Sequence, residues 1–515
     1  MSALEQLDKI EEYIRLGDSA KARVLLHAFL KSTDKSSAKN KKTRPHLARV
    51  TQLCRRAGIP NLGLKVLSRI VRPDSKRLVQ ASAEERAEYA AALTNVGASR
   101  EATEILHSIP FKEFPRTLLY QALAHMNRWE YEKSVPSLEK FCSVTGPDDY
   151  FLRVGQVNLA ASYLASRQLD KAQNLLRELM STFKDKQFSL LRANVQELLA
   201  QNLIFSKNYS AAKKVLEEAA ESLPDKKLIW FLYIKKWEAV IKLREGNLVA
   251  ATEKLRNVQK EAQEKTIWET VRDCDLYLAE AQSSRPLFEK LYMGTPFPHY
   301  RSQLLETFEK TFSTLKDFPP THYQWILRSH TTSKKELPYL DLENACSADA
   351  TKALKFGQLP HKLLLVLAKD FYRPHRIASL HADLFPDRYF NVQSSPQVVQ
   401  QHIHRLRQWF LKNKIPLEIK EHEEFYSLEA RASFAIHTSD KAQKVLESSL
   451  NAKNDHFVGL LKNAFADRDF SSTQVARALK ISLISAKRQL AVAYKSKSLT
   501  KLGSSRMTKY RLERQ

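Results

Sequence analysis

A small residue followed four positions later by a leucine recurs seven times in the first half of this sequence. The small residue stands at positions 22, 63, 102, 134, 172, 212 and 251, and the leucine stands at 26, 67, 106, 138, 176, 216 and 255. Positions four apart share one face of an α-helix, so the small residue lets two helices approach closely and the leucine fills the space one turn on. The pattern predicts helical hairpins that bury their apolar faces only by stacking on one another.

The seven units resemble tetratricopeptide-type repeats, as in residues 165–176 (ASRQLDKAQNLL) and 205–216 (FSKNYSAAKKVL). We therefore expect an α-solenoid over residues 1–284, with an irregular helical bundle as the alternative. The resemblance implies a binding surface rather than a catalyst, with a groove that takes a protein or peptide partner. The units are spaced 32 to 41 residues apart, mostly longer than the ~34 residues usual for such repeats, which predicts longer helices or loops.

The chain is strongly basic, with 83 Lys and Arg against 57 Asp and Glu and a formal charge of +26. An excess of this size favours a polyanionic partner such as nucleic acid, although a basic surface without a partner is the alternative. The polar insert at residues 31–45 (KSTDKSSAKNKKTRP) is predicted to be a loop that either contacts a phosphate backbone or is simply solvated.

Several classes of protein are excluded by absent patterns. The four cysteines, at positions 54, 142, 274 and 346, form no CxxC pair, which argues against a zinc site or disulfide framework and favours a reducing compartment. The chain begins without a signal-peptide pattern and contains no apolar run of eighteen residues. Nucleotide-binding, hydrolase and metalloprotease motifs are also missing. We expect a cytoplasmic, non-enzymatic protein that binds no membrane, no cofactor and no metal.

The periodicity changes after a helical connector at residues 285–320. Short strands are predicted at 323–328 and 338–342, helices at 359–369, 376–385 and 396–412, and a strand pair at 417–420 and 424–428. Together with the segments LDLE at 340–343, QLPHKLLL at 358–365 and VVQQHIHRLR at 398–407, this order resembles the OmpR-type winged-helix domain, over residues 321–430.

In that family the segment at 398–407 is the recognition helix, so the resemblance implies DNA contacts by Gln401, His402, Arg405 and Arg407. The wing departs from the family, because residues 415–430 carry five Glu against one Lys and phosphate repels such a wing. Contact with DNA and a docking or dimerisation role are therefore both open for this domain. His402 and His404 point to different faces of the helix, so no metal site is expected.

A second winged helix is predicted at residues 456–515, after a helical linker at 431–455. Residues 471–490 (SSTQVARALKISLISAKRQL) and 502–512 (LGSSRMTKYRL) follow the order of a helix-turn-helix and a two-stranded wing and resemble the common bacterial winged helix-turn-helix. This region holds thirteen Lys and Arg against three Asp and Glu. The residues expected at the groove and on the wing are Ser485, Lys487, Arg488, Lys501, Arg506, Lys509 and Arg511.

The sequence thus predicts a mostly α protein, an α-solenoid of helical hairpins followed by two winged-helix (α+β) domains. Similar parts occur together in bacterial transcription regulators, although there the DNA-binding domain usually comes first. We expect a regulator that binds double-stranded DNA and uses its solenoid to bind a protein partner or a second copy as a homodimer. The alternative is a non-enzymatic scaffold that uses winged helices as docking modules.

Overall fold

The computed structural model of the chain describes most of its 515 residues. The described residues are 2–33, 44–72, 81–146, 150–183, 189–223, 225, 228–312, 322–327, 337–342, 345–347, 351–355, 357–439, 457–458, 461, 464–465, 468–479, 481–495, 498–503 and 508–512. None of the described helices is long and apolar enough to cross a membrane.

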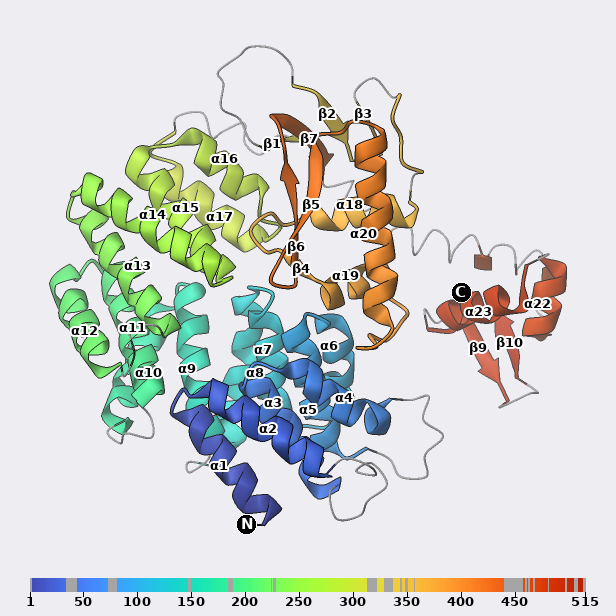
Figure 1. Cartoon of the computed structure of the whole chain (residues 1–515), viewed down its shortest axis with the longest axis horizontal. Coiled ribbons are helices and arrows are strands. Elements are labelled where there is room, and N and C mark those ends of the chain that lie inside the picture. Colours follow the sequence, from blue (N-terminus) through green and yellow to red (C-terminus); the bar gives the residue numbers. More distant parts are fainter. Residues whose placement is uncertain are drawn as a thin grey trace.

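The first half of the chain is a stack of antiparallel helix pairs that follow one another along an arc (Figure 1). The fourteen helices of the seven predicted hairpins are α1 (Ala3–Arg15), α2 (Ser19–Thr33), α3 (Leu47–Arg56), α4 (Pro60–Val71), α5 (Ala83–Val96), α6 (Ser99–His107), α7 (Arg116–Met126), α8 (Tyr131–Val144), α9 (Tyr150–Ala165), α10 (Leu169–Thr182), α11 (Ser189–Phe205), α12 (Tyr209–Ser222), α13 (Ile229–Arg244) and α14 (Leu248–Glu264). The predicted solenoid is confirmed.

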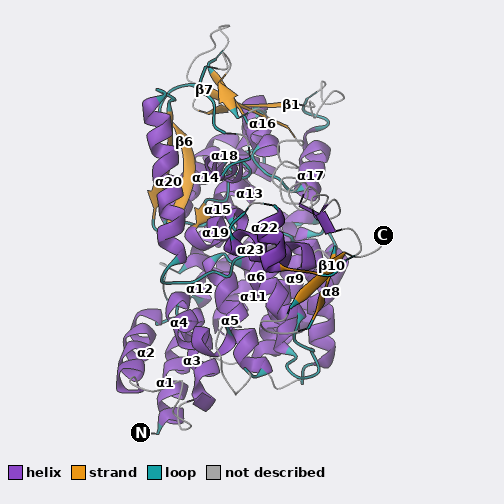
Figure 2. Cartoon of the chain, turned by 90° about the vertical axis from the view of Figure 1, so that its right-hand side faces the viewer, coloured by secondary structure: helices purple, strands orange, loops and turns teal. Residues whose placement is uncertain are grey.

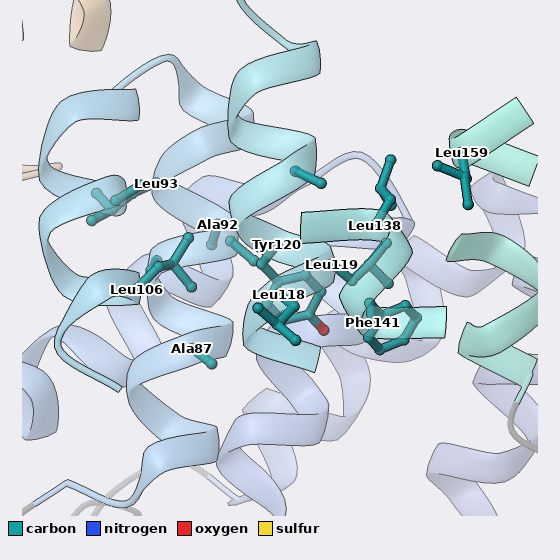
Figure 3. Packing of buried hydrophobic residues seen from close by; sticks show 14 of the residues in the cluster. Ala87, Ala92, Leu93, Leu106, Leu118, Leu119, Tyr120, Leu138, Phe141 and Leu159 are labelled. Atoms are coloured by element: carbon teal, nitrogen blue, oxygen red, sulfur yellow. The ribbon is translucent and has the colours of Figure 1, made fainter. Parts of the chain in front are cut away.

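The small residue and the leucine of every unit are buried on the second helix of its pair. Gly63 illustrates the close approach, because a Cβ built there lies 2.9 Å from Thr51 Cγ2 and 3.2 Å from the Thr51 carbonyl oxygen. Two of the repeated leucines, Leu106 and Leu138, appear in Figure 3 within the core that joins neighbouring pairs. The repeat is therefore the packing pattern of the stack, as the spacing predicts.

One residue in each hairpin turn has a left-handed backbone, always five positions before the small residue. Its φ lies between 58° and 97° at Gly17, Gly58, Gly97, Trp129, Arg167, Lys207 and Gly246. Four of the seven turns supply glycine, which adopts this conformation without a steric penalty, and three hold a residue with a side chain. This periodic position belongs to the same repeat as the buried leucine.

An eighth pair of helices continues the stack across the boundary predicted at residue 284. Helices α15 (Trp268–Gln282) and α16 (Arg285–Met293) pack against each other, with Phe288 at the position of the small residue. A third helix, α17 (Pro298–Phe308), turns back across the arc, where the Gln303 side chain donates to the Ala165 carbonyl oxygen over 3.3 Å. Part of the predicted connector therefore belongs to the solenoid. The sequence pattern missed this pair because Phe288, a large aromatic residue, stands where the other pairs have a small one.

The next region contains three helices and two small sheets. Its helices are α18 (Leu359–Leu367), α19 (Ile377–Leu384) and α20 (Ser395–Lys412), and its strands are β1 (His322–Leu327), β2 (Tyr339–Asp341), β3 (Cys346–Ser347), β4 (His375–Arg376), β5 (Leu417–His422), β6 (Phe425–Ala430) and β7 (Phe434–Ser439). The sheet orders are β1-β7-β2-β3 and β4-β6-β5, with β5 and β6 forming an antiparallel hairpin after α20. Three helices followed by a hairpin is the order that the sequence predicts for residues 321–430, and we refer to this region as the first winged helix after that prediction.

One predicted segment is wrong in this region. Residues 431–455 are predicted to be a helical linker, but Phe434–Ser439 form β7, which pairs antiparallel with β1 and parallel with β2. The antiparallel partner β1 lies more than one hundred residues earlier in the chain, so no local pattern in residues 431–455 predicts the pairing.

The C-terminal region forms a small separate lobe at the right of Figure 1 and in front in Figure 2. Its described elements are β8 (Phe470–Ser471), α22 (Ser472–Ala478), α23 (Leu483–Lys495), β9 (Leu499–Leu502) and β10 (Lys509–Leu512), with sheet order β8-β10-β9. We call it the second winged helix. Most of residues 456–467, at the start of the second winged helix predicted over 456–515, lie outside the described residues.

Candidate nucleic-acid interface

Local hydrogen bonds define the two helices of the second winged helix. The Ser471 hydroxyl accepts from the Gln474 N–H, and the Gln474 side chain accepts from the Ser471 N–H, so a capping box starts α22. The Ser482 hydroxyl accepts from the Ser485 N–H over 3.1 Å at the start of α23. Both caps satisfy backbone donors that a helix leaves unpaired at its first turn.

Helix α23 has a buried face and an exposed face. Ala486, Leu490 and Ala493 are fully buried in the lobe's core, while Lys487 and Arg488 are exposed. The Ser485 side chain is half-buried, and its hydroxyl accepts a hydrogen bond from the Ser482 hydroxyl over 3.1 Å. Of the three groove residues predicted here, the two cations are presented to solvent and the serine is part of the cap.

The wing residues differ in their surroundings. Lys501 and Lys509 are exposed on β9 and β10. Arg511 is exposed as well, but its guanidinium forms a two-point pair with Asp469, at 2.6 Å from Nε to Oδ1 and 3.1 Å from Nη2 to Oδ2. This hydrogen bond lowers the pKa of Asp469. Arg506 lies outside the described residues.

The corresponding helix of the first winged helix, α20, presents only part of its predicted contact set. Gln401 and Arg405 are exposed. His402 is buried against Phe385, with ring centroids 5.8 Å apart, and burial lowers its pKa. The prediction that His402 contacts DNA conflicts with this position, because the residue lies on the inward side of the helix beside Ile403.

Arg407 serves the fold rather than an open surface. Its Nε and Nη2 both donate to the carbonyl oxygen of Ile419, at 3.1 and 2.6 Å. Ile419 belongs to β5, so Arg407 ties α20 to the wing hairpin. Two donors of the guanidinium that the prediction assigned to DNA are therefore engaged within the domain.

The tip of that wing is docked on the solenoid. Phe425, which begins β6, packs edge-on against Trp268 of α15, with ring centroids 5.9 Å apart. The Arg376 guanidinium lies 4.7 Å from the Phe425 ring centroid and donates to the Asn95 carbonyl oxygen over 3.3 Å. The acidic wing thus has a protein partner within its own chain, which agrees with the charge argument against phosphate.

The first winged helix also docks at the other side of the arc. The Phe390 N–H donates to the Glu101 carboxylate over 2.7 Å, and Arg72 donates to the Phe390 carbonyl oxygen over 2.5 Å. The Phe390 side chain and Ala378 are buried in the same apolar cluster as solenoid helices α4 to α11. Burial raises the pKa of Glu101 to about 7. These contacts unite the two domains through a shared core.

A third contact lies at the end of the solenoid. The Tyr372 hydroxyl donates to Asp275 of α15 over 2.6 Å, and Lys290 pairs with the same carboxylate at 2.6 Å. The three contacts place the first winged helix across the open side of the arc (Figure 1). The solenoid groove predicted for a peptide is therefore covered, at these points, by the chain's own domain.

Two features of the structure were not predicted from the sequence, an exposed apolar residue on α23 and a contact between the domains. Ile484, which is 82 % exposed on α23, precedes Lys487 and Arg488 by three and four positions, and this helical spacing was available as a signal. Glu101 and Phe390 had no such signal, because only the tertiary structure brings them together.

Comparison with known proteins gives little beyond the fold class. No known family pattern matches the chain, and no curated protein matches it in sequence. Among solved structures, a tetratricopeptide repeat protein from Parabacteroides merdae is similar at 14% identity and a TM-score of 0.34, over 54% of this chain and 98% of that one. A human IFIT1 dimer with PPP-AAAA is similar at 11% identity and a TM-score of 0.29, over 95% of this chain and 94% of that one. Likenesses this distant assign no function.

Proposed function

We propose that this protein is a non-catalytic, DNA-binding transcription regulator in the cytoplasm, and that its second winged helix places α23 in the major groove of duplex DNA. The observation that carries the proposal is the exposed Lys487 and Arg488 pair on a capped helix whose opposite face forms the lobe's core. Lysine and arginine at this position suit phosphate oxygens and guanine edges. Lys501 and Lys509 are exposed on the wing strands and add positive charge to the lobe, on opposite faces of the β9–β10 hairpin.

The first winged helix has a different place in the proposal. Its order of an N-terminal sheet, three helices and a hairpin is consistent with the OmpR type, but its wing tip and Arg407 are engaged within the protein. We assign it a structural role, in which it packs across the open side of the solenoid arc. Gln401 and Arg405 remain available for a secondary contact with DNA.

The solenoid is proposed to bind a protein partner or a second copy of the chain on surfaces that the first winged helix does not cover. Stacked helical hairpins expose extended surfaces of this kind. The second candidate function, a scaffold without DNA, is supported by the docked wing, whose tip contacts another part of the same chain.

A titration of the full chain against a fluorescent 30-base-pair duplex separates the two functions. Counterion release predicts that affinity falls steeply as salt rises from ~50 to ~200 mM. The double variant Lys487→Ala and Arg488→Ala is expected to lose at least about tenfold in affinity and to lower the salt slope by about 1 for each phosphate contact removed.

The matched control replaces Lys213 and Lys214, an adjacent and equally exposed pair on α12, with alanine. This variant removes the same charge and should retain wild-type affinity. Equal losses in both variants indicate only nonspecific charge attraction, and unchanged affinity in the Lys487 and Arg488 variant contradicts the proposed interface.

A further inference from the structure

Resting on the proposed function, which it makes more specific, we propose that Ile484 is a specificity-determining residue that contacts thymine methyl groups in the major groove. The proposal concerns which base the exposed face of α23 recognises. It starts from an apolar side chain that the fold itself does not use.

Ile484 is 82 % exposed and its neighbour Leu483 is 41 % exposed. The core of the lobe is formed from the opposite face of α23, at Ala486, Leu490 and Ala493. An exposed isoleucine gains no burial energy and is a weaker helix former than alanine or lysine. Val249 on α14 is equally exposed, so exposure alone does not identify a contact residue, and Ile484 is distinguished by the charged residues beside it.

The surroundings identify the chemistry of that partner. Lys487 and Arg488 follow Ile484 by three and four positions, so all three side chains share one face of the helix. An apolar side chain beside two cations suits a surface that exposes a methyl group between rows of anions. The major groove of duplex DNA has this arrangement, since the thymine C5-methyl lies on the base edges between the phosphate backbones.

The position along the helix agrees with base contact. In a helix-turn-helix, the first residues of the second helix reach the base edges, and Ile484 is the second residue of α23. The Ser485 hydroxyl is held by Ser482 in the cap, and Ile484 is more exposed than its neighbour Leu483, so it is the side chain of this turn best placed to reach the bases.

The test uses the full chain and a duplex selected from a random pool for binding to it. The selected duplex is prepared again with deoxyuridine in place of thymidine, which removes only the C5-methyl groups. The wild type is expected to bind the uracil duplex about fourfold more weakly for each methyl it contacts, the factor that corresponds to ~0.8 kcal/mol per buried methylene-sized group. Ile484→Ala should bind the thymine duplex more weakly and lose nothing further on the change to uracil.

Val249→Ala is the matched control, because Val249 is also 82 % exposed and is also the second residue of its helix, α14. This variant should discriminate thymine from uracil as the wild type does. Wild-type binding that is equal for the two duplexes, or an Ile484→Ala variant that still discriminates, overturns the thymine contact and leaves the proposed function standing. A random pool from which the wild type selects no duplex overturns the proposed function itself.

Discussion

The backbone N–H of Phe390 donates a hydrogen bond to the Glu101 carboxylate over 2.7 Å, although the two residues are 289 positions apart. Phe390 lies between α19 and α20 of the first winged helix, and Glu101 lies on α6 of the solenoid. Glu101 is 9 % exposed, so its charge is largely removed from water. The contact between the two domains therefore depends on the protonation state of the Glu101 carboxyl group.

We expect Glu101 to make stability depend on pH in a defined direction. Burial raises its pKa from 4.5 to about 7, so between these values the folded protein holds a proton that the unfolded chain has released. The free energy of unfolding therefore falls, for this group, as pH rises from 4.5 to 7. Glu101→Gln keeps an acceptor for Phe390 without the titration. Denaturant unfolding of both proteins across this range should show the wild type losing up to about 3 kcal/mol relative to the variant; a constant difference contradicts the prediction.

His381 is expected to act in the opposite direction. Burial, reinforced by Arg388 and Arg72, lowers its pKa from 6.5 to about 4, so acidification protonates the unfolded chain first. The contribution of this group to the free energy of unfolding is lost as pH falls from 6.5 through 4. His381→Gln retains a donor or acceptor near the Ser395 hydroxyl, which lies 3.1 Å from the His381 ring nitrogen Nε2. Its thermal midpoint should decline less than that of the wild type between pH 6.5 and 4.5, and parallel declines count against this role.

Gly63→Ala is expected to destabilise the solenoid through direct overlap. The added Cβ lies 2.9 Å from Thr51 Cγ2 and 3.2 Å from Thr51 Cα, and relief of that contact must separate α3 from α4. Overpacking of this kind costs about 1–3 kcal/mol. Gly146→Ala is the control, because a Cβ at that position meets nothing within 4 Å. Urea denaturation should show a lower midpoint for Gly63→Ala alone, and equal midpoints would rule out the overlap.

Two substitutions at the left-handed turn position should change stability in opposite directions, because glycine adopts this backbone conformation without strain and other residues do not. Lys207 has φ 61° in its hairpin turn, and Gly246 has φ 84° at the equivalent turn position with no atom near its missing Cβ. Lys207→Gly removes a left-handed penalty of about 1–2 kcal/mol against the ~0.5–1 kcal/mol entropy cost of glycine. We expect a gain of up to about 1 kcal/mol for Lys207→Gly and a loss of about 1 kcal/mol for Gly246→Ala. Shifts of the same sign in differential scanning calorimetry contradict the account.

The repeat was predictable because its signal is local. A small residue and a leucine four positions on act within one helix pair, and the same is true of the caps at Ser471 and Ser482. The eighth pair was missed because Phe288 occupies the small-residue position, and the strand β7 was missed because its partner β1 is distant in the chain.

The part of the candidate interface that lies on the single helix α23 could be predicted from the sequence. Lys487 and Arg488 follow from the spacing of Ala486 and Leu490, since residues on one face of α23 fix what lies on the other. Helical periodicity alone places His402 on the buried face of α20, three positions after Val399 and four before Leu406, so the prediction of a DNA contact at His402 overlooked an available signal. Arg407 could not be placed in this way, because its position depends on the Ile419 carbonyl oxygen in a neighbouring strand.

Periodic side-chain patterns thus predict seven of the eight helix pairs and the helices of the two regions that follow, since every such pattern depends on contacts within a few turns of chain. The union of the solenoid with the first winged helix depends instead on pairs such as Glu101 with Phe390 and Trp268 with Phe425. Those pairs join surfaces whose complementarity exists only after both domains have folded. The spacing of residues in the sequence does not predict such complementarity. The covered groove and the docked wing are therefore decided only by the tertiary structure.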